Sequence, residues 1–265
     1  MTLLVPYLTA GLTEDWIDYL LAVQEAGADA IEVGLPFSDP MLDGATIQQA
    51  SDRALARGVT VASILQELSL VRGQVRTPLI AFTYANLVFR PGPDVFCRRL
   101  AEAGFRGLIV PDLPLDEVAE VSRAAEQAEI ELTLLVAPVT TDERLAEIVA
   151  RSRGYVYAIS RMGTTGEQTS LAASAAALAA RIKAVTTLPV LVGFGVTGPE
   201  QAVAAGRAGD GVAIGSALMR RVLDGATAAD LGAEVAALRA ALDSASQEDS
   251  AERRTPYAEV SGHRG

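Results

Sequence analysis

The stretch AIEVGLPFSDPMLDG, residues 30–44, joins a short apolar run to a long loop rich in Pro, Asp and Gly. The run, residues 30–35, has the length and composition of a buried β-strand. It nevertheless carries a carboxylate, Glu32, and the following loop carries a second one, Asp43. A glutamate inside a strand suited to burial requires an explanation, and that explanation depends on the surrounding fold.

Seven more apolar runs have a similar composition, and helical patterns separate them. The predicted strands are residues 3–10, 30–35, 78–84, 107–112, 131–138, 154–160, 189–195 and 211–217. Amphipathic stretches such as TEDWIDYLLAVQEAG and TDERLAEIVARS open with Thr and acids, which are typical of helix N-termini. Eight strands that each precede a helix predict an α/β fold, a single (β/α)8 TIM barrel, over residues 1–243. The alternative is an open doubly wound sheet, but TAGLTED after the first strand lacks the G-x-G-x-x-G turn of that fold.

The composition excludes several classes of protein and site. A net charge of −11 argues against general binding to nucleic acid or anionic membranes. The single cysteine, Cys97, excludes an intrachain disulfide framework, and no leader or uncharged apolar run of about 18 residues is seen, so we expect a soluble, cytoplasmic protein. The only histidine is His263, near the end of a polar tail, and the only lysine is Lys183. Histidine triads, His-rich zinc sites and thiolate clusters therefore lack residues, and the chemistry must use carboxylates, tyrosines, hydroxyls and backbone groups.

Alternation along the second strand directs Ile31 and Val33 towards the helices and Glu32 and Gly34 towards the barrel axis. A partly desolvated carboxyl group there should have a raised pKa and exchange a proton near neutrality. The alternative is a structural acid that pairs with an arginine.

The loop after this strand is too long for a minimal connection. We interpret Asp39 as a turn or capping residue, because Asp favours both positions. Asp43 is either a turn residue as well or a second carboxylate of the site, reachable from Glu32 across the barrel mouth.

Small residues follow the seventh and eighth strands, in VGFGVTGPEQA and IGSALM. Loops at these positions of a TIM barrel often bind phosphate through backbone N–H groups and a helix N-terminus. Gly193, Gly195, Gly215 and Ser216 leave the backbone accessible for this purpose, although these glycines are also compatible with simple tight turns.

The sixth strand ends in GYVYAISRMGTTGEQTS, whose loop, residues 161–170, is long enough to close over a ligand. Tyr155 and Tyr157 share one face of that strand, either as core residues or with a hydroxyl at the mouth. Arg161 either steadies the loop or contacts phosphate.

Taken together, these segments resemble tryptophan synthase alpha chains over about residues 3–243. The motifs that carry the resemblance are PYLTAG, IEVGLPFSDPMLDGATIQ, YANLVF, GLIVPDLP, GYVYAISRMGTTG, VGFGV and AIGSA. The resemblance implies a retro-aldol cleavage of indole-3-glycerol phosphate to indole and glyceraldehyde 3-phosphate, without cofactor or metal. It also implies a beta subunit as partner, in an α2β2 heterotetramer.

Residue by residue, the resemblance implies that Glu32 shuttles the proton, that Asp43 accepts the indole N–H and stabilises the cationic ring, and that Tyr157 lies beside Glu32. It further implies substrate contacts from Tyr7, Thr83, Ile109 and Thr165, and phosphate contacts from Gly166, Gly193, Phe194, Gly195, Gly215 and Ser216.

The chain departs from the family pattern at several positions. It begins on the first strand, without the helix that usually precedes it, and Ala45 replaces a common proline. Met162 and Thr164 occupy positions where the family often has a small polar residue and valine. Residues 244–265 lack an apolar period, so we predict a polar, mobile or loosely docked tail.

Three rival functions remain open at the level of sequence. A Schiff-base aldolase needs a lysine on a strand, whereas Lys183 lies in a helical pattern. A catalytically idle barrel that only regulates a beta subunit would not need both carboxylates and both glycine-rich turns. A free-standing lyase that releases indole to another pathway has the same residues as a partnered one. Cys97 is expected to be a helix residue without chemistry.

Overall fold

The computed structural model describes residues 1–159, 168–193 and 196–254, with the backbone alone for 168–173 and 250–254. Eight parallel strands form a closed barrel in chain order, and β8 pairs with β1. The strands are β1 (Leu3–Thr9), β2 (Ile31–Gly34), β3 (Leu79–Phe82), β4 (Phe105–Ile109), β5 (Glu131–Val136), β6 (Val156–Ile159), β7 (Val190–Gly193) and β8 (Gly211–Ile214). The predicted (β/α)8 barrel is therefore confirmed.

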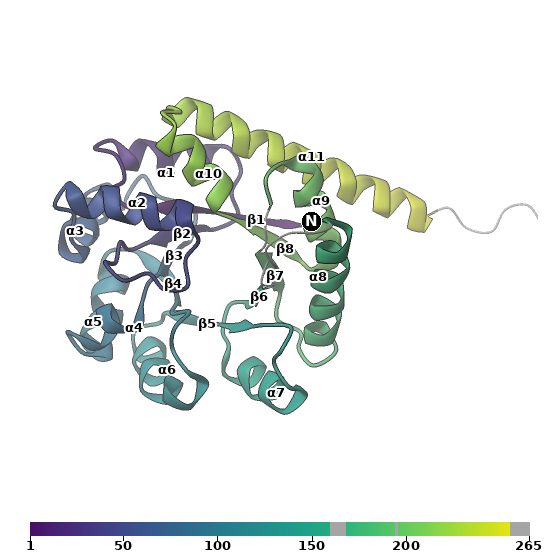
Figure 1. The fold of residues 1–265 in the computed structure, drawn as a ribbon, viewed down its shortest axis with the longest axis horizontal. Helices are drawn as coiled ribbons and strands as arrows, with labels where there is room; N and C mark the ends of the chain where they lie inside the picture. The colour runs from purple at the N-terminus through teal and green to yellow at the C-terminus, as the bar shows by residue number, and fades with distance from the viewer. Residues whose placement is uncertain (160–167, 194–195, 255–265) are drawn as a thin grey trace, which may run out of the picture.

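Helices surround the ring of strands on its outer side (Figure 1). They are α1 (Trp16–Glu25), α2 (Ala45–Ala56), α3 (Val61–Val71), α4 (Ala85–Phe89), α5 (Pro93–Glu102), a 3-10 turn η1 (Leu115–Glu117), α6 (Val118–Gln127), α7 (Asp142–Arg151), α8 (Gln168–Lys183), α9 (Pro199–Ala208), α10 (Ser216–Leu223) and α11 (Ala228–Arg254). As predicted, the Thr141 side chain caps α7 by accepting from the Arg144 N–H. Thr13 does not cap α1, which begins later, at Trp16, without a side-chain cap.

The strands divide the apolar core into two parts. Ile31 and Val33 of β2 belong to the layer between the strands and the helices. A smaller cluster fills the barrel interior, with contributions from Val5, Ile80, Ile109, Tyr155 and Leu191. The predicted alternation on β2 is confirmed, because Glu32 bonds to a member of this interior cluster.

The last helix, α11, packs along α1 and α9 and extends beyond the barrel (Figure 1). Its Arg239 side chain forms a 3.0 Å ion pair with Asp29 and donates to the Thr2 carbonyl at 2.9 Å. These contacts join the end of the helical layer to the start of the first strand.

The boundary predicted at residue 243 falls inside α11, so residues 244–254 are not the loose tail that was expected. Ala245 is buried, and the hydroxyls of Ser246 and Thr2 lie 3.2 Å apart. Arg207 of α9 forms a 3.2 Å ion pair with Asp249. Polar contacts hold this part of the helix, and for that reason an apolar period does not reveal it. Residues 255–265 lie outside the described residues.

Within the described ranges, no single helix is long and apolar enough to cross a membrane. The pair α2 and α3 meets the length and composition test only when taken together across an 88° bend.

Candidate active site

Glu32 lies inside the barrel, 1% exposed, and its Oε1 atom accepts a 2.9 Å hydrogen bond from the Tyr155 hydroxyl. Burial raises the pKa of Glu32 to about 8, and the bond from Tyr155 opposes part of that rise. At neutral pH this carboxyl group therefore holds a proton that it can donate and later recover.

Tyr157 lies near Glu32, as expected, but it is not the residue that hydrogen-bonds to it. The hydrogen bond to Glu32 comes from Tyr155, two residues earlier in the chain and on the same face. The ring centroids of the two tyrosines lie 6.3 Å apart. Burial, followed by the nearby Glu32 carboxylate, raises the pKa of the Tyr157 hydroxyl, so this group remains a protonated neighbour of the site.

The position of the Tyr157 ring also explains why residue 193, on the adjacent strand β7, is a glycine. A Cβ atom on Gly193 would lie 2.3 Å from the Tyr157 hydroxyl oxygen and 2.5 Å from its Cζ atom. Only glycine allows this ring to lie flat against β7. Gly193 is thus required by packing, in addition to any contact with phosphate.

Asp43 occupies the loop between β2 and α2, and its pKa is raised by burial to about 6. A hydrogen bond with the Tyr84 side chain lowers that pKa in part. The loop is folded on itself, since the Gln48 amide donates to the Asp43 carbonyl at 2.8 Å. Asp39 lies in a local turn, as predicted, because its carbonyl accepts from the Met41 N–H at 2.8 Å, and its side chain accepts from the Ser38 hydroxyl at 2.6 Å.

Tyr7 faces both carboxylates. The charges of Asp43 and of Glu32 both raise the pKa of its hydroxyl, after the larger effect of burial. Its ring meets Phe82 edge to face, with centroids 5.7 Å apart. A Cβ atom on Gly34 would lie 1.9 Å from the Tyr7 hydroxyl, so that strand needs glycine there. Tyr7 thus lies close to both acids and to Phe82.

Ile109 and Thr83, two residues predicted to contact the substrate, lie at and near the ends of β4 and β3. Ile109 belongs to the interior cluster. Thr83 directly follows β3 and is fully buried, and its hydroxyl has no hydrogen-bond partner among the described residues, so its contact with substrate stays a prediction. Phe82, the last residue of β3, packs on the interior cluster and on Tyr7.

The phosphate positions are described only in part. Gly215 precedes α10, whose first residue, Ser216, is exposed and presents free backbone N–H groups at the helix N-terminus. The other predicted contacts of this kind lie outside the described residues, together with the lid positions: Thr165, Gly166, Phe194, Gly195, Arg161, Met162 and Thr164.

Lys183 and Cys97 lie on helices outside the ring of strands. Lys183 ends α8 and forms an ion pair with Asp210, outside the barrel. Cys97 is buried on α5, and burial raises the pKa of its thiol to about 11.

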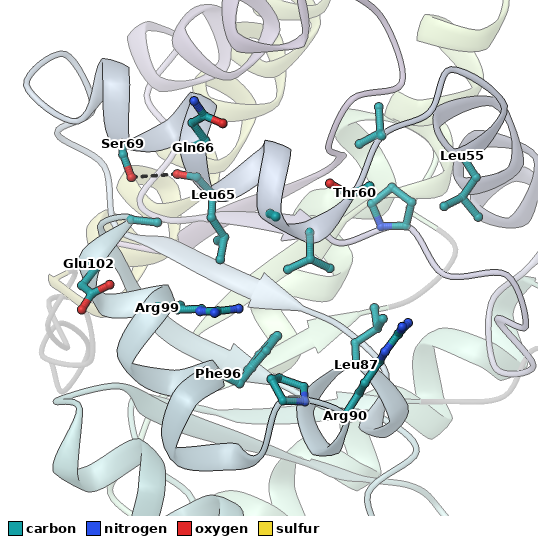
Figure 2. Close-up of a pocket in the computed structure, with 16 residues that line it drawn as sticks. Leu55, Thr60, Leu65, Gln66, Ser69, Leu87, Arg90, Phe96, Arg99 and Glu102 are labelled. Carbon is teal, nitrogen blue, oxygen red and sulfur yellow. Dashed lines mark hydrogen bonds between the residues drawn. The ribbon is translucent and has the colours of Figure 1, made fainter.

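A groove of about 800 Å³ lies outside the barrel. Helices α3, α4 and α5 line it, together with the C-terminal end of α2. Figure 2 shows Leu65, Leu87 and Phe96 directed into it, with Arg90 and Arg99 nearby. Pro36, the residue that opens the Asp43 loop, also lines it. The groove therefore adjoins the site without containing either carboxylate.

Comparison with known proteins matches this chain to one family. The family model described as tryptophan synthase alpha chain matches residues 1–248. The tryptophan synthase alpha chain of Synechococcus sp. (strain CC9902) is 43% identical over 246 residues, which cover 91% of each chain. That of Prochlorococcus marinus (strain MIT 9313) is 45% identical over 222 residues, covering 83% of this chain and 81% of the relative.

Solved structures give the same result. Tryptophan synthase subunit alpha from Legionella pneumophila str. Paris has a TM-score of 0.84 at 32% identity and covers 92% of this chain and 93% of its own. A chain of the tryptophan synthase α2β2 complex from Pyrococcus furiosus has a TM-score of 0.84 at 36% identity, over 90% and 98% of the two chains. This (β/α)8 barrel thus belongs to the tryptophan synthase alpha chain family.

Proposed function

We propose that this chain cleaves indole-3-glycerol phosphate to indole and glyceraldehyde 3-phosphate. The observation that carries the proposal is the presence of two desolvated carboxyl groups that both act on the Tyr7 hydroxyl, Glu32 with a pKa of about 8 and Asp43 with a pKa of about 6. One is protonated and the other ionised at neutral pH, which gives the site an acid and a negative charge together.

The two groups have complementary parts in a retro-aldol reaction. Glu32 donates its proton to C3 of the indole ring, and Asp43 accepts the indole N–H and balances the positive charge that develops on the ring. Glu32 then removes the proton of the glycerol hydroxyl next to the ring as the carbon–carbon bond breaks. The bonding electrons return to the ring, which leaves as indole, and the hydroxyl carbon becomes the aldehyde.

Backbone groups at Gly215 and Ser216 are suited to the phosphate. The N-terminus of α10 offers free N–H groups and the positive end of a helix dipole. On a chain with a net charge of −11, neutral donors provide an anion site without a cluster of basic side chains.

A beta subunit is the proposed partner. The relative from Pyrococcus furiosus comes from an α2β2 complex. In this chain Met41 and Leu42 of the Asp43 loop are 85% and 54% exposed, which is unusual for adjacent large apolar residues and favours burial against a partner. A cytoplasmic location is part of the same proposal and is supported by the composition, with one cysteine that the structure shows free and buried.

The direct test is an indole-release assay on the purified chain with indole-3-glycerol phosphate. The proposal requires stoichiometric indole and glyceraldehyde 3-phosphate. Absence of both products, with and without a beta subunit, would leave the idle barrel as the better account.

A further inference from the structure

We propose that Tyr84 is a positioning residue for the reaction, which holds the Asp43 loop and directs its hydroxyl proton at the Asp43 carboxylate. This inference rests on the role of Asp43 in the proposed function. No motif of the sequence assigns a role to Tyr84, which lies in TYANLVF between β3 and α4.

The backbone around Tyr84 is fixed from two sides. Tyr84 directly precedes α4 and is 4% exposed. The N–H of the next residue, Ala85, donates to the Asp112 carboxylate at 2.8 Å. That bond caps the start of α4 with a group from the β4 loop, so the base of the Tyr84 side chain has little freedom.

The ring of Tyr84 is held by the loop that it contacts. Phe37 stacks on it with centroids 5.2 Å apart and planes inclined by 27°. Phe37 and Asp43 flank the exposed tip of the loop, residues 38–42. The stacked rings join the start of this loop to β3, and the hydroxyl group of Tyr84 lies near its end.

The hydroxyl makes two contacts that together determine its orientation. It accepts from the Leu42 N–H at 3.2 Å, and it hydrogen-bonds to the side chain of Asp43. A phenol has one proton to donate. Because the Leu42 N–H is itself a donor, the Tyr84 proton is free to point at the Asp43 carboxylate.

This donor has an electrostatic effect on Asp43. Burial raises the pKa of Asp43, and a hydrogen bond to the ionised form opposes that rise. Among the residues that the structure describes, the other titratable groups that interact with this pair are the Tyr7 hydroxyl, on the side of Asp43, and the Asp112 carboxylate, on the side of Tyr84. Neither supplies positive charge, so within the described part of the chain Tyr84 is the donor that favours the ionised carboxylate.

The test compares Tyr84→Phe with the wild-type chain in the indole-release assay across a range of pH. We expect kcat to fall roughly 10- to 100-fold, as on loss of a preorganised donor, with a smaller change in KM. The acid limb of the kcat profile should move to higher pH, because Asp43 becomes harder to ionise. Tyr19→Phe is the matched control, since it removes another buried hydroxyl, bonded to the Ala226 carbonyl at 2.8 Å, outside the barrel. It should leave the profile unchanged.

The same substitution made in the Asp43→Asn variant distinguishes a positioning role of Tyr84 from a folding defect. In Asp43→Asn, the further change Tyr84→Phe should lower kcat by less than about twofold, because the group on which Tyr84 acts is already lost. An equal loss in both backgrounds would show a structural role and overturn the proposal.

A pH titration of Asp43, followed by the NMR signal of its side-chain carboxyl carbon, tests the proposal without relying on enzyme activity. The midpoint should rise in Tyr84→Phe and stay in place in Tyr19→Phe, whether or not the chain releases indole. An unchanged midpoint in Tyr84→Phe overturns the role of Tyr84. Normal turnover by Asp43→Asn would instead contradict the proposed function.

Discussion

The hydroxyl of Tyr155 reaches Glu32 across the barrel. Tyr155 directly precedes β6, and β6 lies four strands from β2 in either direction around the closed ring. Their 2.9 Å hydrogen bond therefore spans the interior and holds the Glu32 carboxyl group near the axis. Burial and the Glu32 charge raise the pKa of Tyr155, so its proton stays on the phenol at physiological pH.

Replacement of Glu32 by Gln should abolish most indole formation while substrate binding survives. Glutamine keeps the shape and can accept from Tyr155, but it cannot carry a proton. We expect kcat to fall by roughly 10²- to 10⁴-fold or more. Steady-state kinetics and binding of a substrate analogue measure the two effects separately. Turnover close to the wild-type value would remove Glu32 from the mechanism.

The same variant should be more stable than the wild type at alkaline pH. The pKa of Glu32 is about 8 in the folded chain and 4.5 as its ordinary value, so the folded state binds the proton more tightly. The contribution of this proton to stability is complete below pH 4.5 and is lost as the pH rises to about 8. A tenfold difference in proton affinity between the folded and unfolded chain changes the free energy of unfolding by about 1.4 kcal/mol.

Urea unfolding at pH 5 and pH 9 tests this expectation. Glu32→Gln should gain roughly 4 kcal/mol over the wild type at pH 9 and little at pH 5. Glu126→Gln, at an exposed position of α6, is the control and should differ little at both values. A gain that is equal at the two pH values would mean that Glu32 does not titrate between them.

Replacement of Asp43 by Asn should slow turnover more than it weakens binding. A neutral amide cannot balance positive charge on the indole ring, and the loss of one preorganised electrostatic partner typically raises the barrier by about 3–4 kcal/mol. The change should appear in kcat. A raised KM with an unchanged kcat would make Asp43 a binding or capping residue.

Gly215→Val should raise KM by roughly 10-fold or more, because branched carbons block the approach of phosphate to the backbone. A Cβ atom at this position already lies 3.2 Å from the Tyr7 Cβ atom, so valine also displaces Tyr7. Ser216→Ala keeps every backbone donor and serves as control, with KM expected within about threefold of wild type. A larger effect from Ser216→Ala would show that the hydroxyl, and not the backbone, binds phosphate.

Titration with a beta subunit should raise the rate of cleavage strongly. Met41 and Leu42 are exposed beside Asp43, and a partner that covers them would favour one conformation of the loop without adding a catalytic group. Ala45, at the start of α2, leaves this backbone freer than a proline would. High activity of the chain alone, unchanged at saturating beta subunit, would favour the free-standing lyase.

The features predictable from the sequence are those encoded in local periodicity. Eight apolar runs predict eight strands, and a period of two places Glu32 inside the barrel. The hydrogen bond from Tyr155 to Glu32 and the contact of Phe82 with Tyr7 were not predicted. The alternation of a strand shows which face a residue lies on, but it does not show how far along the strand the partner on another strand lies.

Contacts between segments that are distant in the sequence could not be predicted either. The bond from Tyr84 to the Asp43 loop joins residues about forty positions apart, and neither local sequence contains a signal for it. The end of α11 was missed because ion pairs such as that of Arg207 and Asp249 stabilise it, and these leave no apolar stripe.

The pairing of β1 with β8 has a consequence for the synthesis of the chain. Leu3 finds its register partner, Gly211, only after most of the protein has been translated. Until then the outer edge of the first strand has unpaired backbone groups and can accept a strand from another nascent chain. Residues 3–9 therefore present an open sheet edge during synthesis, which closes only when β8 has been made.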